Sequence, residues 1–196
     1  MYTLCTTEKT AQQQRQFEKA FLELALEIAY DDLTVSELCR KAGLSRKIFY
    51  RLFERKGDVL YALVDHTLLD AAVHEPDSSV REGGLHRFLD FWRSQKDLLD
   101  VLHKNKGSAI LTESAIQLIL HEGSEFSHCL GLNDTKFGRQ ALAFYISGIF
   151  ALVLDWHKQD FAQSIDELSE ALMYLLTTPP VKHPLLSDPC VLDPYK

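Results

Sequence analysis

Residues 34–53 read Thr-Val-Ser-Glu-Leu-Cys-Arg-Lys-Ala-Gly-Leu-Ser-Arg-Lys-Ile-Phe-Tyr-Arg-Leu-Phe, and this stretch predicts two short helices. Thr34 and Glu37 have the spacing of a capping box, in which the first side chain accepts from the fourth amide and the fourth side chain reaches back. Gly43 tolerates the positive φ with which helices often end. Ser45 is a favourable N-cap for a second helix. The stretch therefore predicts a helix-turn-helix arrangement.

The second of these helices, residues 46–53, carries basic and aromatic side chains at spacings of one, three and four: Arg46, Lys47, Tyr50 and Arg51. Eight helical residues extend about 12 Å, which suits a DNA major groove ~12 Å wide. The N-terminal residues of such helices read base edges. The alternative is an ordinary solvated charged face. The coincidence of the basic residues with a helix-turn-helix favours DNA binding.

The distribution of charge along the chain supports DNA binding, although the total net charge is negative. The chain has 196 residues, with 21 Lys and Arg against 28 Asp and Glu, a net charge of −7. Residues 1–60 hold 10 basic and 9 acidic residues, and residues 61–196 hold 11 and 19, so the two parts carry +1 and −8. Residues 40–56 alone carry seven basic residues and one acid. Because salt screens charges over roughly 8 Å, a local basic patch can attract phosphate despite a distant acidic region.

The rest of the chain is also predicted to be helical. Thr10 to Gln13 has the form of a capping box at the start of an amphipathic first helix, and a fourth helix is expected from Lys56 to about Val73. After Pro76, a capping box at residues 79–82 precedes further helices. These are expected at 80–94, 96–104, 109–128, 134–158 and 164–177.

The resulting fold class is all-α, with about nine helices: a three-helix helix-turn-helix domain joined to a larger helical C-terminal domain. Five of the six prolines lie in the last 18 residues, which predicts an extended tail. The expected organisation is a flexible N-terminus at 1–9, a DNA-binding domain at 10–56, a ligand-binding and dimerisation domain at 57–177, and the tail at 178–196.

Several function classes have no support in the sequence. The N-terminus has no secretory signal pattern, and the longest nearly apolar stretch, residues 141–154, is shorter than the ~20 residues of a membrane span. We therefore expect a cytoplasmic protein without a membrane partner. The four cysteines have no C-x-x-C spacing, no metal-binding histidine motif is present, and the nucleophile pattern G-x-S-x-G is missing. We expect no metal, no cofactor and no enzymatic activity.

Residues 42–56, followed by Val59-Leu60, resemble the signature of TetR family transcriptional regulators. The resemblance implies that Thr34 and Tyr50 hold phosphates, that Lys56 adds a phosphate contact, and that Arg46 and Lys47 face bases. The same DNA-binding surface is expected to include Ser36, Ser45, Ile48 and Arg51. Ile48 stands where the family usually has a small residue, which suggests apolar contact with a thymine methyl. Arg55 stands where a side-chain cap is usual.

Residues 145–156 and 164–176 resemble, more weakly, the eighth and ninth helices of a TetR subgroup. The resemblance implies a homodimer formed through residues 134–158 and 164–177, and an internal pocket for an unidentified small-molecule effector. The candidate pocket residues are Phe88, Trp92, His103, Phe126, Phe144 and Tyr145. Periodic aromatic residues in helices are also typical of an ordinary core.

The sequence thus favours a ligand-responsive repressor that acts as a homodimer on double-stranded DNA, at a palindromic operator. The alternative is a co-regulator or adaptor whose C-terminal domain mainly binds a protein partner; a large exposed apolar patch would favour it. A third hypothesis, an α-helical enzyme, would require convergent titratable groups in a cleft.

Overall fold

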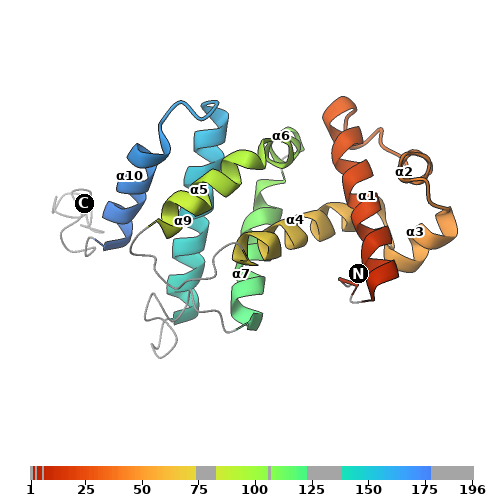
Figure 1. Ribbon diagram of the computed structural model, residues 1–196, viewed down its shortest axis with the longest axis horizontal. Coiled ribbons are helices and arrows are strands. Elements are labelled where there is room, and N and C mark those ends of the chain that lie inside the picture. The colour runs from red at the N-terminus through yellow and green to blue at the C-terminus, as the bar shows by residue number, and fades with distance from the viewer. Residues whose placement is uncertain are drawn as a thin grey trace, which may run out of the picture.

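The computed structural model describes residues 2, 4–5, 7–73, 83–105, 107–122 and 138–177. Over these residues the chain forms α-helices and no strand, which confirms the all-α prediction. The helices are α1 (Glu8–Glu27), α2 (Val35–Ala42), α3 (Arg46–Leu52), α4 (Lys56–Val73), α5 (Gly84–Ser94), α6 (Lys96–Lys104), α7 (Ser108–Glu122), α9 (Gly138–Lys158) and α10 (Ile165–Thr177). Figure 1 shows α1–α3 grouped at one end of the molecule, α5, α7, α9 and α10 at the other, and α4 running between the two groups.

Most predicted helix boundaries agree with the structure where it describes them, and the first one does not. Helix α1 begins at Glu8 with Thr7 as N-cap, so the predicted capping box at Thr10 is wrong. The Thr10 hydroxyl instead donates to the Thr7 carbonyl oxygen at 3.0 Å, a bond that threonine makes within the first helical turn. The predicted capping box at 79–82 and the tail at 178–196 lie outside the described residues.

The caps of the helix-turn-helix form as predicted. The Glu37 amide donates to Thr34 Oγ1 at 3.2 Å, and the Thr34 amide donates to Glu37 Oε2 at 2.9 Å. Gly43 ends α2 in the left-handed conformation at φ 67°, which a residue with a side chain rarely adopts. The Ser45 hydroxyl caps α3 by accepting from the Ile48 amide at 3.3 Å. Local sequence therefore fixes where both helices begin and where α2 ends.

Three aromatic rings hold the helix-turn-helix against α1. Phe17 packs edge to face on Phe49 and on Phe53, with ring centroids 5.3 and 5.9 Å apart. All three rings are 2% exposed or less. Edge-to-face geometry is the favoured arrangement of aromatic pairs. These contacts set the position of α3 relative to α1.

The ammonium group of Lys56, the first residue of α4, binds the connection between α1 and α2. Its Nζ donates to the carbonyl oxygens of Tyr30, Asp31 and Leu33 at 2.7, 3.0 and 2.9 Å. It also lies 4.5 Å from the centroid of the Tyr30 ring, a cation–π distance. A Cβ at Gly57 would lie 2.9 Å from the Tyr30 hydroxyl, so a larger residue there would require the Tyr30 side chain to shift. The start of α4 is thereby locked to the chain segment that precedes α2.

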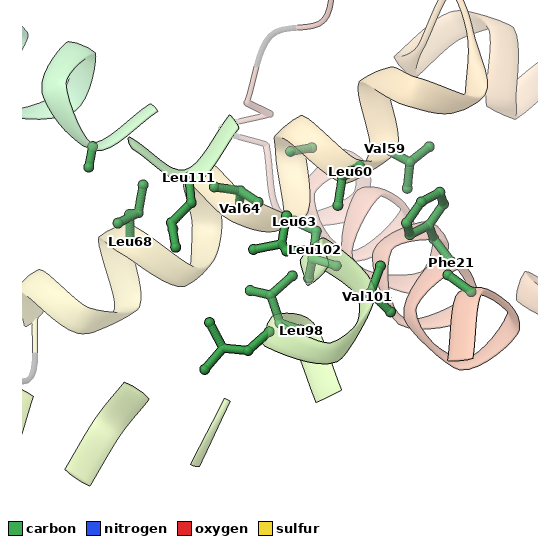
Figure 2. Close-up of a cluster of buried hydrophobic side chains, with 14 of the residues drawn as sticks. Phe21, Val59, Leu60, Leu63, Val64, Leu68, Leu98, Val101, Leu102 and Leu111 are labelled. Carbon is green, nitrogen blue, oxygen red and sulfur yellow. The ribbon is translucent and has the colours of Figure 1, made fainter. Parts of the chain in front are cut away.

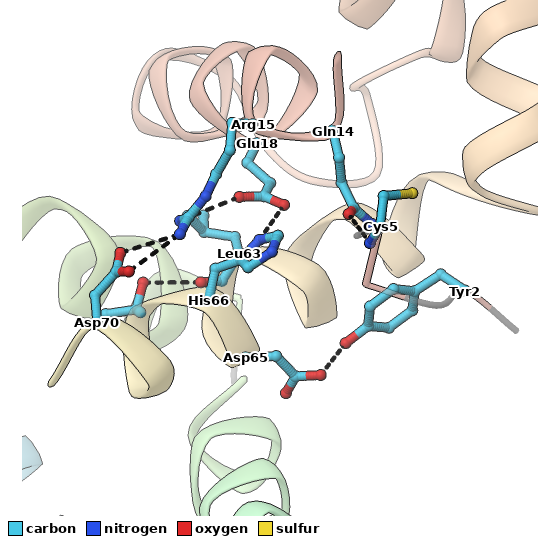
Figure 3. Close-up of polar contacts among 10 residues, drawn as sticks. Tyr2, Cys5, Gln14, Arg15, Glu18, Leu63, Asp65, His66 and Asp70 are labelled. Carbon is cyan, nitrogen blue, oxygen red and sulfur yellow. Dashed lines mark hydrogen bonds and ion pairs between the residues drawn. The ribbon is translucent and has the colours of Figure 1, made fainter. Parts of the chain in front are cut away.

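A polar network joins α1 to the middle of α4 (Figure 3). The Glu18 carboxylate, 2% exposed, lies 2.7 Å from Nδ1 of His66, which is 8% exposed. Arg15 donates to both carboxylate oxygens of Asp70, at 3.1 and 3.3 Å. Buried charged groups are tolerated only when they are paired, so this network specifies how α4 is rotated against α1.

The apolar core continues from α1 into the C-terminal helices without interruption (Figure 2). Helix α4 contributes to it on both sides, together with residues of α1, α6 and α7. The labelled members are Phe21, Val59, Leu60, Leu63, Val64, Leu68, Leu98, Val101, Leu102 and Leu111. Helix α9 is apolar and long enough to match a membrane span by length and composition, yet eight of its residues are buried, seven of them in this core. Among the described residues no other helix passes that test.

Removing the Thr34 hydroxyl should cost about 1 kcal/mol of unfolding free energy, the usual value of an N-cap. Hydrogen bonds from the Thr34 hydroxyl and amide lower the pKa of Glu37, so this carboxylate stabilises the fold above its unfolded pKa of about 4.3. The contribution is lost as the pH falls through the folded pKa. Urea denaturation should therefore show that the deficit of Thr34→Ala narrows at acidic pH. Thr7, whose side chain makes no capping bond, provides the control: Thr7→Ala should change stability much less. Equal deficits for the two variants would contradict this assignment.

Replacing Lys56 with methionine should lower the unfolding free energy by about 2 kcal/mol, because hydrogen bonds from a charged group are lost and the apolar stem is kept. Lys56→Arg should recover only part of this loss, since a planar guanidinium cannot direct its donors at three converging carbonyls. Urea denaturation at pH 7 measures both effects. An unchanged midpoint for Lys56→Met would show that the carbonyl contacts do not stabilise the fold.

Candidate nucleic-acid interface

The outer face of α3 presents basic and aromatic side chains to solvent, while its inner face is buried. Arg46, Lys47 and Arg51 are exposed, and Phe49 is fully buried. Tyr50 is 53% exposed, although its ring packs edge to face on Phe49 at 5.3 Å. This side chain is anchored by the core and still presents its hydroxyl outward. The structure thus brings together the residues of the predicted recognition helix on one surface.

Two of these side chains have partners that orient them. The Arg51 guanidinium donates to Gln13 Oε1 of α1 at 2.6 Å. The Tyr50 hydroxyl lies beside Arg46, and this interaction raises the pKa of the Arg46 guanidinium further above its already high value. Lys47 makes no hydrogen bond or ion pair with the part of the chain that the structure describes. Arg46 and Arg51 are held in place, whereas Lys47 is free to adapt.

The structure reduces the number of basic residues available to an outside anion. Lys41 pairs with Glu23 at 2.9 Å, and this bond raises the pKa of Lys41 and lowers that of Glu23. Arg55 pairs with Asp58, with 3.4 Å between Nε and Oδ1. Together with Lys56, three of the seven basic residues of segment 40–56 therefore bind the protein itself. The outward charge is concentrated in Arg40 and the three basic residues of α3.

Asp58 is a functional residue that the sequence reasoning missed. It is 3% exposed, and its Oδ2 accepts from the Glu54 and Arg55 amides at 2.9 and 3.2 Å. This carboxylate caps the start of α4, where Arg55 provides no side-chain acceptor. The spacing of three residues between Arg55 and Asp58 matches the second half of a capping box and could have revealed the role.

The other predicted DNA-contact residues differ in how far their side chains are free to face outward. Thr34 is exposed, but its hydroxyl is engaged with Glu37, to which it donates at 2.7 Å. Ser36 is exposed on α2, and Ser45 serves as the α3 cap. Ile48 is half-buried and packs against the core, so only part of its side chain faces outward.

Lys56 departs from the expected phosphate contact. An ammonium group has three donors, and the carbonyl oxygens of Tyr30, Asp31 and Leu33 occupy all of them. No donor of the side chain remains for a phosphate. The structure thus gives Lys56 an internal role, which the sequence pattern did not reveal because the three acceptors are backbone atoms.

The predicted pocket residues do not form one site. Trp92 is fully buried and packs against Phe88 and Phe150, with ring centroids 6.2 and 5.1 Å away. Its Nε1 has no hydrogen-bond partner among the described residues. His103 is exposed at the end of α6, and Phe144 is 75% exposed on α9, so an internal pocket position is wrong for both. The half-buried Tyr145 packs against Phe144, with ring centroids 5.6 Å apart. Phe126 lies outside the described residues.

No cluster of three or more His, Cys, Asp or Glu side chains suited to a metal ion occurs within the described ranges.

No protein-family model matches the sequence, and no curated protein matches it. Solved structures do match the fold. Lin0861 from Listeria innocua aligns with a TM-score of 0.70 at 18% identity, over 88% of this chain and 93% of that chain. A TetR-family transcriptional regulator from Streptomyces coelicolor aligns with a TM-score of 0.59 at 17% identity, over 88% and 80%. The fatty acid degradation regulator FadR from Bacillus halodurans aligns with a TM-score of 0.56 at 16% identity, over 91% and 99%.

The likeness covers both the helix-turn-helix end and the C-terminal helices, since about nine-tenths of the chain aligns. Identities below one in five establish a shared fold. The chain has the all-α fold of the TetR-family transcriptional regulators.

Proposed function

We propose that the protein is a cytoplasmic, sequence-specific DNA-binding transcriptional regulator that acts as a homodimer. The observation that carries this proposal is the outer face of α3. A helix with fixed caps presents Arg46, Lys47 and Tyr50 to solvent in a chain whose remainder is acidic. Seven residues of α-helix are about 11 Å long, which suits the major groove. The acidic C-terminal part disfavours DNA, so attraction is confined to the face that carries α3.

The roles of the α3 side chains differ with their positions. Arg46 and Lys47 occupy the first turn, from which recognition helices reach base edges. Arginine binds guanine with two parallel hydrogen bonds, and the Tyr50 hydroxyl orients the Arg46 guanidinium. Arg51, held by Gln13 at the side of the helix, suits a phosphate contact. We assign base reading to the first two residues and backbone contact to Arg51.

These roles can be tested by measuring, with fluorescence anisotropy, the affinity of each variant for a DNA duplex that the wild-type protein selects from a random pool. Arg46→Ala or Lys47→Ala should cost about 1–3 kcal/mol of binding and relax the preference at one base position. Arg51→Ala should weaken binding to all sequences and reduce the slope of log K against log salt by about 1. Lys158→Ala, an exposed change at the distant end of α9, is the matched control. Failure to select any preferred sequence at moderate salt would refute the proposed function.

The exposed face of α9 supports the homodimer. Phe144 is 75% exposed, and Gly148 and Ala151 follow on the same face at helical spacing, both exposed. A Cβ at Gly148 would meet no atom within 4 Å. Helix α10 adds the exposed side chains of Tyr174 and Leu175. A large aromatic residue beside small residues suits close packing against an identical helix, and a two-fold dimer would present two recognition helices to a palindromic operator.

Gly148→Leu separates dimerisation from folding. The side chain would enter open space in the monomer, and replacing a mid-helix glycine favours the helix, so thermal stability of the monomer should not fall. We expect the variant to sediment as one 22.4 kDa chain where the wild type sediments as two. Gln117→Leu, on an exposed position of α7, controls for surface hydrophobicity. A wild-type monomer would instead favour the co-regulator alternative, in which this apolar face binds another protein.

The buried Trp92 supports a response to a small-molecule effector, with repression as the simplest output. Its indole N–H lies inside an aromatic cluster and has no acceptor within the described part of the chain, and a buried unpaired donor costs free energy. A mainly apolar ligand that carries an acceptor would satisfy it. The FadR structure belongs to a regulator of fatty acid degradation. For the present chain, the effector is defined only by this chemistry.

A further inference from the structure

The helix-turn-helix end and the C-terminal helices meet at a second place besides α4, namely the C-terminal end of α6. Helix α6 packs against α1, and Val101 and Leu102 are fully buried there. Figure 2 shows Val101 directed toward Phe21 of α1. Because α1 and α6 are far apart in the sequence, this contact joins the two groups of helices without a chain connection.

The last residue of α6 supplies a cap that α1 lacks. Helix α1 has no basic residue in its last turn, and its C-cap, Ile28, has an extended backbone. The ammonium of Lys104 lies 3.3, 3.4 and 3.3 Å from the carbonyl oxygens of Ala25, Leu26 and Ile28. These are long hydrogen bonds, but the position is the one at which a helix favours a cation. The contact therefore holds the end of α1 to α6.

The start and the middle of α6 are tied to α9 and to the turn after it. Asp100 of α6 lies 2.8 Å from Nε2 of His157, which is 7% exposed. Lys96 pairs with Asp160 at 2.6 Å, and this pairing lowers the pKa of Asp160. Helix α6 thus has polar contacts to α9 near its start and its middle, and to α1 at its end.

We propose that α6 is a strut between α9 and α1, and that Lys104 is the positioning residue through which the strut holds the helix-turn-helix. The end of α1 leads directly into the connection bound by Lys56 and then to the α2 cap at Thr34. A shift of α6 relative to α9 changes the position of this segment, and with it the position of α3. The inference rests on the proposed DNA-binding function. It adds a second connection between the C-terminal helices and the helix-turn-helix, besides α4.

The first test is hydrogen exchange of the full-length protein without DNA. Lys104→Met keeps the apolar stem and removes the donors, so amides at the end of α1 and in the connection to α2 should lose protection. Because the Lys104 contacts are long and depend mainly on the cation at the helix end, Lys104→Arg should restore protection, unlike arginine at the shorter contacts of Lys56. Lys158→Met should behave as wild type. Unchanged exchange in Lys104→Met would overturn the contact itself.

The second test uses a duplex selected from a random pool by the wild-type protein. Coupling is reciprocal, so DNA binding should protect amides of α6 in the wild type and not in Lys104→Met. The affinity of Lys104→Met for this duplex should fall by about fivefold or more, and Lys104→Arg should recover it. A role confined to stability would leave DNA-induced protection of α6 intact, and that result would overturn the strut.

A variant at the other end of α6 covers the case in which Lys104→Met does not fold. Asp100→Asn removes the charge that faces His157 and leaves the Lys104 contacts in place. The strut predicts that DNA binding still protects α6 in this variant but no longer protects the end of α9 around His157, as it should in the wild type, and retained protection of α9 would overturn the proposal. If no duplex is selected by the wild type, the proposed function fails, while the exchange experiment without DNA still decides whether Lys104 holds α1.

Discussion

The contact between the Lys56 ammonium and three backbone carbonyls determines where the recognition helix is held. The segment between α1 and α2 has no helix or strand to satisfy its carbonyl oxygens, and Lys56 binds those of Tyr30, Asp31 and Leu33. A single cation replaces the hydrogen bonds that secondary structure would provide. Because Lys56 also begins α4, the same contact fixes the entry to α2 and the start of the helix that leads to the C-terminal part.

This arrangement changes the electrostatic interpretation of the basic segment. Counted along the sequence, residues 40–56 form a dense positive region. In the structure, Lys41, Arg55 and Lys56 bind protein groups, and the charge that faces outward belongs mainly to α3. Lys41 and Arg55 are paired with carboxylates, which balance their charge locally, and Lys56 keeps its charge but has no donor left for a phosphate. The surface offered to a phosphate backbone is therefore narrower than the sequence suggests, and it is centred on one helix.

Local signals in the sequence predicted the parts of the fold that depend on neighbouring residues. The caps of α2 and α3 lie within four residues of the helix ends that they cap, so spacing alone identified them: Thr34, Glu37, Gly43 and Ser45. The Thr10 cap failed because α1 begins about one turn earlier, at Glu8, although the Thr7 side chain at its N-cap position makes no capping bond. No side-chain cap therefore marks the true start of this helix, and spacing alone could not locate it.

Contacts between distant residues were not predictable in this way. Glu18 and His66 are 48 positions apart, and nothing in the pattern near either residue indicates the pair. The pocket assignments failed for a related reason: helical spacing groups Phe144 with other apolar residues but does not say which side of α9 is covered. Asp58 is a different case, because it was missed although its partners, the Glu54 and Arg55 amides, lie only four and three residues before it.

Two lysines from other helices bind carbonyl oxygens at and after the end of α1, and they show why long-range contacts matter for the position of α3. Helix α1 ends without glycine or a basic residue of its own, so its C-terminal carbonyls depend on Lys104 from α6, and the carbonyls that follow depend on Lys56 from α4. Both cations come from helices that continue into the C-terminal core. The position of the recognition helix is consequently set by elements outside the helix-turn-helix itself. A chain built this way can change the presentation of α3 through small movements of α4 or α6, without any change in the residues that face DNA.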